Sequence, residues 1–248
     1  MAPNSYFDWL LLAIAAFGIG ITKSGFSGVS MVHVYLFATV FGAKNSTGIV
    51  LPMLIAGDVF AMLVYGKRAN WGYVRRMMPP TLVGVVLGWL LMFWLPEQHY
   101  RPLIGTIILG LTVLQIVRLW KEEWFAEVPH SIWFAWSMGV LVGLTTMLAN
   151  AAGPVFGLYL LAIGLPKLEF VGTAAWFFLL LNVVKIPFSW SLGLIRLDTL
   201  SLNAMLIPLI ALGLWIGTLV IHRIPQRLFD SVILILTGLA SIRMLFWQ

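Results

Sequence analysis

The sequence predicts an all-α integral membrane protein made of two homologous halves. Of its 248 residues, 61% are hydrophobic and only 10% are charged, whereas roughly 25% are charged in an ordinary soluble domain. Mean hydropathy is +0.98. A soluble fold of this length needs a more polar exterior, so these figures exclude a soluble enzyme, a nucleic-acid binder and a disordered protein. Because the chain has no cysteine, disulfides, thiolate metal sites and thiol nucleophiles are excluded as well.

The membrane segments follow from length, because a straight helix needs about 20 apolar residues to cross a bilayer core of about 30 Å. Apolar segments cover 7–22, 25–42, 48–66, 77–95, 103–119, 132–149, 151–165, 170–190, 200–221 and 231–247. Only Thr22-Lys23-Ser24 separates the first two, and 132–149 meets 151–165 at Asn150, ahead of Gly153-Pro154. We therefore expect each half to begin with a broken or hairpin segment and to continue with three transmembrane helices.

The two halves repeat each other in order along the chain. Gly18 and Gly28 match Gly143 and Gly153 at one common offset, Asp58 falls opposite Asn182, and Pro79, Gly84 and Gly88 match Pro208, Gly213 and Gly217. Single glycine and proline matches are weak, but their common order indicates a duplication. We expect a first repeat at 1–120, a cytoplasmic linker at 121–131 and a second repeat at 132–248.

Loop charges predict the orientation. Loop 67–76 carries Lys67, Arg68, Arg75 and Arg76 without an acid, which places it in the cytoplasm by the positive-inside rule. If each broken pair leads the chain back to its starting side, each half crosses an odd number of times. The halves are then inverted repeats and both termini lie outside. The alternative is eight simple crossings in two parallel halves. Either way, the net charge of +6 reflects loop charge and calls for no nucleic acid.

The first break combines features suited to an anion. An ionisable residue inside an apolar segment is costly and therefore informative, and Lys23 lies in Thr22-Lys23-Ser24-Gly25-Phe26-Ser27-Gly28. The next helix would begin near Ser27 or Gly28, with its free N–H groups and positive dipole end beside the ammonium. Ser24 and Ser27 add hydroxyl donors. The alternative is that Lys23 only reaches from a hairpin tip to water.

The second half offers a matching set of polar groups. Asn150 either caps the helix that begins near Gly153 or donates to a bound oxyanion; close packing of small residues is the competing interpretation. Asn182 and Lys185 lie three residues apart on segment 170–190, hence on one helical face, and Thr173 begins the same segment. Lys185 binds the anion unless it lies at the outer interface.

Two further ionisable residues bear on coupling. Asp58 either pairs with Lys23 or carries a proton, and His33 either serves as a proton relay or is a satisfied buried histidine. The sequence has no H-E-x-x-H, G-x-S-x-G or Walker motif. We therefore expect no enzyme, no cofactor and no metal, and transport powered by an H⁺ or Na⁺ gradient or by a separate subunit.

The sequence resembles the sulfite exporter TauE/SafE family over nearly its whole length. The segments on which the resemblance rests are Thr22-Lys23-Ser24-Gly25-Phe26-Ser27-Gly28, Met147-Leu148-Ala149-Asn150-Ala151-Ala152-Gly153-Pro154, Leu158-Tyr159-Leu160-Leu161, Leu165-Pro166-Lys167, Phe170-Val171-Gly172-Thr173, Phe177-Phe178, Asn182 and Lys185-Ile186-Pro187. The resemblance implies a multi-pass permease of the bacterial plasma membrane that moves sulfite, organosulfonates or related small anions. Many members carry a G-x-G-G-G run, where this chain has Gly-Phe-Ser-Gly and Asn-Ala-Ala-Gly, so the substrate itself is not carried over.

These observations together predict a secondary transporter of a small anion, such as a sulfur oxyanion, an organosulfonate or a carboxylate, that works by alternating access. The expected partners are that anion, the lipid bilayer and a coupling ion. Two alternatives stay open. One is an intramembrane enzyme or an accessory membrane subunit; the other is a transporter of a cation or a neutral solute, with Asp58 central.

Overall fold

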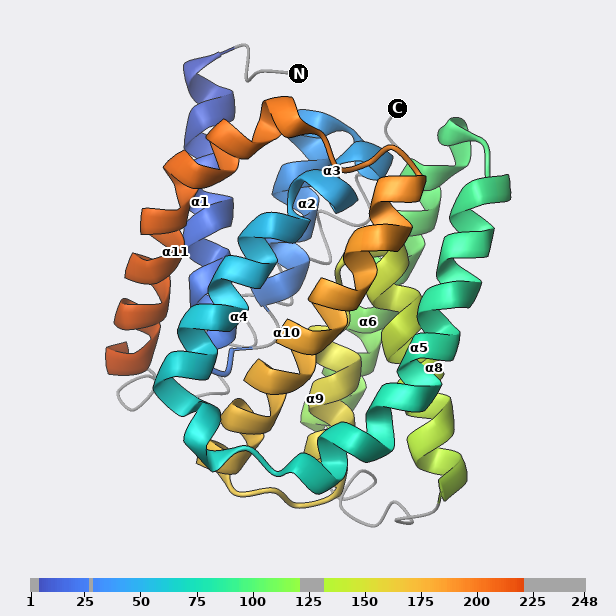
Figure 1. Cartoon of the computed structure of the whole chain (residues 1–248), viewed down its shortest axis with the longest axis vertical. Coiled ribbons are helices and arrows are strands. Elements are labelled where there is room, and N and C mark those ends of the chain that lie inside the picture. Colours follow the sequence, from blue (N-terminus) through green and yellow to red (C-terminus); the bar gives the residue numbers. More distant parts are fainter. Residues whose placement is uncertain (1–4, 27–28, 121–131, 221–248) are drawn as a thin grey trace.

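Helices form the regular structure throughout the described part of the chain (Figure 1), as the sequence predicts. The computed structural model describes residues 5–26, 29–120 and 132–220. Its helices are α1 (Tyr6–Lys23), α2 (Ser30–Phe41), α3 (Ala43–Ile49), α4 (Leu51–Tyr65), α5 (Trp71–Trp94), α6 (Tyr100–Trp120), α8 (Ile132–Ala149), α9 (Gly153–Ala162), α10 (Lys167–Ser191) and α11 (Leu200–Val220), with 3-10 turns η2 (Gly66–Arg68), η3 (Glu97–His99) and η4 (Leu197–Thr199). The predicted linker 121–131 and segment 231–247 lie outside the described residues.

Five of these helical runs are long and apolar enough to cross a membrane. They are Tyr6–Lys23, Trp71–Trp94, Ile132–Ala149, Leu168–Ser191 and Leu197–Leu219, and the pair Ala43–Ile49 and Leu51–Arg68, bent by 42°, qualifies as one further broken span. Their outward faces are apolar, with exposed Leu, Val, Phe and Trp side chains that suit contact with lipid. The protein is therefore a multi-pass membrane protein.

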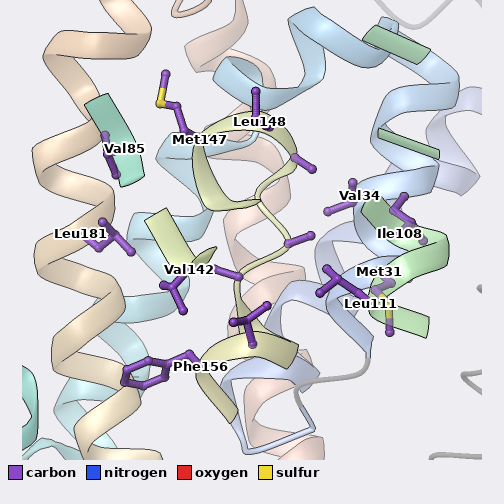
Figure 2. Packing of buried hydrophobic residues seen from close by; sticks show 14 of the residues in the cluster. Met31, Val34, Val85, Ile108, Leu111, Val142, Met147, Leu148, Phe156 and Leu181 are labelled. Carbon is purple, nitrogen blue, oxygen red and sulfur yellow. The ribbon is translucent and has the colours of Figure 1, made fainter. Parts of the chain in front are cut away.

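Each half opens with a broken hairpin, and the second arm of each is short. At 1.5 Å per residue, α2 with 12 residues is about 18 Å long and α9 with 10 residues about 15 Å. Each thus covers about half of a 30 Å hydrocarbon core. Gly25 (φ 113°) and Asn150 (φ 52°) turn the chain in the two breaks. In Figure 2 the break lies between Leu148 at the end of α8 and Phe156 in α9.

Glycine contacts join each half to the other in the same way. A Cβ on Gly143 of α8 would overlap the backbone oxygen of Thr81 of α5, and one on Gly20 of α1 would overlap that of Ile210 of α11. The reverse contacts also match, because Gly84 lies against Val140 and Gly213 lies against Phe17. Close backbone approach through small residues is the usual way in which helices pack in membranes. The third span of each half therefore packs on the first span of the other.

These contacts correct one detail of the repeat. Gly20, rather than Gly18, occupies the place that Gly143 has in the second half. Gly18 instead lies near Val29 and His33. The match of Gly18 with Gly143 is thus two residues out of register, while Gly84 and Gly213 match as predicted.

The two central helices run in opposite directions. Gly48, before α4, lies against Leu194, which follows α10. Gly172, near the start of α10, lies against Tyr65 and the turn after α4. Start-to-end contacts at both ends require antiparallel helices, and Figure 1 shows α4 and α10 crossing side by side. This arrangement is compatible with the predicted inverted repeat.

The apolar core packs around the second break. It includes Met31 and Val34 of α2, Ile108 and Leu111 of α6, and Val142, Met147 and Leu148 of α8, all labelled in Figure 2. The Thr112 hydroxyl, one turn on from Ile108, donates to the carbonyl oxygen of that residue and lies 3.5 Å from the sulfur of Met31. α2 is therefore fixed against α6, and the cavity described next lies beside a packed wall.

Candidate functional site

One cavity of about 70 Å³ lies where the two breaks meet the central helices. Both broken segments line it, together with α2, α4, α9 and α10. The lining residues are Thr22, Lys23, Gly25, Ser30, His33, Leu54, Asp58, Ala61, Thr146, Asn150, Ala152, Gly153, Phe156, Gly157, Phe170, Val171, Ala174, Ala175, Phe178 and Asn182. A space of this size suits a small solute.

A buried carboxylate forms the centre of the polar lining. Asp58 of α4 has a side chain with no exposure, and its Oδ1 accepts a hydrogen bond from the ammonium of Lys23 at 2.5 Å. Its Oδ2 accepts from the amide of Asn182 on α10 at 2.7 Å. The two residues that the repeat places in equivalent positions therefore contact each other. Both oxygens of the carboxylate are paired, as a buried charge requires.

A second lysine, which is buried, bonds the other break to α10. The Nζ of Lys185 donates to Oδ1 of Asn150 at 2.6 Å, to the carbonyl oxygen of Thr146 at 2.9 Å and to its hydroxyl at 3.0 Å. Lys185 is only 2% exposed, so it does not lie at the outer interface. The amide of Asn150 donates in turn to the backbone oxygen of Thr47 at 2.8 Å. Asn150 thus fixes the second break with both ends of its side chain.

The two halves use one lysine each, in opposite senses. In the first half the lysine, Lys23, lies at the break and its acceptor lies on the long helix α4. In the second half the lysine, Lys185, lies on the long helix α10 and its acceptors lie at the break. The Asp58–Asn182 bond joins α4 to α10 between them. Asn182 in turn accepts from the Nζ of Lys185 at 3.5 Å. A continuous polar network therefore connects the two breaks.

With all three of its charged groups ionised, the cluster of Lys23, Asp58 and Lys185 carries an excess of positive charge. In their ordinary ionised forms Lys23 and Lys185 carry two positive charges, and Asp58 carries one negative charge. All three side chains are largely withdrawn from solvent. An uncompensated charge in a low-dielectric interior is costly, and an ion of opposite sign lowers that cost. The described residues of this cluster thus favour a bound anion.

Aromatic rings form part of the cavity wall. Phe178 of α10 lies under the ammonium of Lys23, whose Nζ is 5.3 Å from the ring centroid. Phe156 of α9 stacks on Phe177 with ring centroids 4.1 Å apart. Phe156 and Phe178 thus give the cavity an apolar surface beside the polar network, and apolar surroundings strengthen electrostatic interactions.

The structure brings together most, but not all, of the predicted site residues. Six of them line the cavity: Lys23, His33, Asp58, Asn150, Gly153 and Asn182. Lys185 does not line it but donates a hydrogen bond to Asn150, which does. Ser24 and Thr173 do not line it. The Ser24 hydroxyl donates to the backbone oxygen of Ile21 and lies against Gly217 of α11, while Thr173 accepts from the backbone N–H of Asn70 near η2. Ser27 and Gly28 lie outside the described residues.

Sequence reasoning missed three contributors to the network. Thr146 provides two acceptors for Lys185, and Phe178 supplies the ring beneath Lys23. Thr146 could have been found, because it lies one helical turn before Asn150 and so shares its face. Thr47 takes part through its backbone oxygen, which accepts from Asn150. A pattern of side chains cannot predict such a contact.

A family model for the sulfite exporter TauE/SafE matches residues 12–244, nearly the whole chain. The chain belongs to the TauE/SafE sulfite exporter family. No curated protein and no solved structure matched the chain. Because the match spans both halves, the network and its cavity lie within the region that defines a family of transporters of sulfur anions.

For this TauE/SafE protein the relevant feature of the cluster is its set of donor groups. Within residues 5–26, 29–120 and 132–220, no group of three or more histidine and acidic side chains could hold a metal ion. The cluster instead offers ammonium and amide donors, which are the groups that recognise oxyanions.

Proposed function

We propose that this protein is a secondary transporter of a small anion, namely a sulfur oxyanion, a short organosulfonate or a carboxylate, that works by alternating access. The observation that carries the proposal is a polar network beside a cavity of about 70 Å³, in which one buried lysine (Lys185) and one largely buried lysine (Lys23) accompany one buried carboxylate, Asp58. A bound monovalent anion would neutralise this excess. Alternation would come from movement of one half against the other about the shared site.

The site argues against the cation-transporter alternative. A cation bound to Asp58 would have to compete with the Lys23 ammonium, which pairs with Oδ1, and with the Asn182 amide, which donates to Oδ2. Lys185 adds a further positive charge within the same network. Coupling to H⁺ or Na⁺, with Asp58 or His33 as the proton carrier, stays a prediction from the sequence.

Uptake into proteoliposomes tests the proposal. The purified full-length chain should accumulate ³⁵S-labelled sulfite in a saturable manner, and unlabelled methanesulfonate or a short carboxylate should compete. Lys185→Met should lower uptake about 10- to 100-fold, because it removes a positive charge beside the cavity together with the bonds that hold Thr146 and Asn150 at the second break, and hydrogen bonds to a charged group contribute about 1.5–3 kcal/mol each.

Arg196→Gln is the matched control, since it also removes one positive charge, but from an exposed side chain that pairs with Asp198 away from the cavity. It should transport sulfite at the wild-type rate. Wild-type uptake by folded Lys185→Met would contradict the site assignment, and the absence of flux for every anion tested would favour the enzyme or accessory-subunit alternative.

A further inference from the structure

His33 of α2 is a buried polar residue that the network leaves out. Its side chain lines the cavity, and the residue is only 1% exposed. Neither Nδ1 nor Nε2 has a hydrogen-bond partner within the described residues. His33 thus differs from an ordinary buried histidine, which is satisfied by its neighbours.

The other polar side chains around the cavity are already engaged. Lys23 and Asn182 both donate to Asp58, the Thr22 hydroxyl donates to the oxygen of Ile19, and both ends of the Asn150 amide are paired. Ser30 also has a partner. Among the described polar side chains that line the cavity, His33 is therefore the one whose polar atoms are all available to an occupant.

Leaving such atoms unpaired is costly. A neutral imidazole carries one N–H donor and one nitrogen acceptor, and each buried polar atom without a partner carries a desolvation penalty. A solute that enters the cavity removes part of this penalty by accepting the N–H. An anion is also attracted by the excess positive charge of the cluster, so both contributions act on the same ligand.

We infer that His33 is a direct ligand of the transported anion, and that its ring N–H donates to an oxygen of the bound sulfite or sulfonate. The inference rests on the proposed function. In this arrangement Lys23 and Lys185 attract the anion by their charge while they keep their hydrogen bonds within the protein. His33 forms the directional hydrogen bond to the anion. His33 is then a specificity-determining residue that favours anions with an exposed oxygen acceptor over halides.

Three variants of the full-length protein test this assignment. His33→Leu removes both polar atoms, whereas His33→Gln keeps one donor group and one acceptor. Tyr159→Phe is the control, because the hydroxyl of Tyr159 is also buried and unpaired but does not line the cavity. For sulfite uptake, His33→Leu should raise KM about tenfold or more. His33→Gln should stay within about threefold of the wild type, and Tyr159→Phe should match it.

A second measurement does not depend on the folding of a variant. In wild-type protein with ¹⁵N-labelled histidine, saturating methanesulfonate should shift the ring nitrogen resonances of His33, and chloride at the same concentration should not. Unchanged resonances, or a wild-type KM in His33→Leu, would overturn the inference alone. A wild type that shows no saturable uptake of any anion would overturn the proposed function and the inference together.

Discussion

Asp58 is the residue on which the polar network depends. Its carboxylate is fully buried and joins Lys23 of the first break to Asn182 of the central helix α10. A buried ion pair contributes little net stability compared with apolar residues, but removing one partner leaves an unpaired charge in the interior. The pair is therefore sensitive to single substitutions and tolerant of paired ones.

This asymmetry gives a prediction for stability. Asp58→Asn should lower the free energy of unfolding by about 3 kcal/mol, because Lys23 loses its counter-charge. The double variant Lys23→Met/Asp58→Asn should recover a large part of that loss. Chemical unfolding in detergent, followed by tryptophan fluorescence, measures both. If the double variant were instead less stable than Asp58→Asn, Lys23 and Asp58 would not be energetically coupled.

At the residue scale, the sequence predicts which side chains are expensive in a membrane, and all of these except His33 form the network. Asp58, Asn182 and Lys185 stand out because a polar group in an apolar segment needs a partner. Helical rotation decides the remainder: Ser24 follows Lys23 directly, but its hydroxyl turns back to Ile21. Such rotation depends on where the helix ends, and helix ends are the least reliable part of an assignment made from sequence.

At the scale of helices, glycine sets how closely the halves approach. Gly143 on α8 and Gly20 on α1 leave no space for a Cβ against the facing backbone, whereas nothing lies within 4 Å of a Cβ added at Gly110 of α6. Replacing a glycine is thus expected to have opposite effects on stability at the two kinds of position. A methyl group at a tight contact forces two backbones apart, while in open space it improves helix propensity.

Alanine substitutions test this difference. Gly143→Ala and Gly20→Ala should each lower the free energy of unfolding by about 1–3 kcal/mol through overpacking. Gly110→Ala should leave it unchanged or raise it by up to about 1 kcal/mol. Melting of the detergent-solubilised protein ranks the three. A Gly143→Ala variant as stable as Gly110→Ala would show that α5 and α8 do not pack closely.

The positions of the helices could be predicted from the sequence, but the helix partners could not. Segment 77–95 is visible as an apolar run, and α5 (Trp71–Trp94) covers all of it except the last residue. Its preferred neighbour, α8, begins beyond a linker in the other half, and nothing in a single apolar run identifies a distant partner. Only the matching glycines indicate which helices pack together. Even there the sequence match selects Gly18, whereas the contact is made by Gly20, two residues further on.

For the whole molecule, the directions of the helices fix which loops share a side. The turn η2 and the loop before η4 flank opposite ends of α10, a helix of 25 residues that spans about 37 Å. The positive-inside rule predicts that the basic residues at 67–76, and η2 with them, lie in the cytoplasm. On that prediction the loop that contains Arg196 lies outside.

Cysteine labelling checks this orientation cleanly, because the natural chain contains no cysteine. In intact cells, Arg196→Cys should react with a membrane-impermeant maleimide, whereas Lys67→Cys should react only after the membrane is opened. Both side chains are exposed in the structure, so lack of reaction reflects the membrane and not burial. Labelling of Lys67→Cys alone in intact cells would reverse the predicted orientation.

The exchange of partners between the halves also governs how the protein is made. α1 leaves the ribosome long before α11, the helix that covers its glycine face. At about 5–20 residues per second the delay is on the order of 10–40 s. Until then α1 has only α2 and α4 of its own half to pack against, and α5 waits a shorter time for α8. Of the two glycine contacts between the halves, the α5–α8 contact can therefore form first, and the α1–α11 contact can close only after α11 has been made.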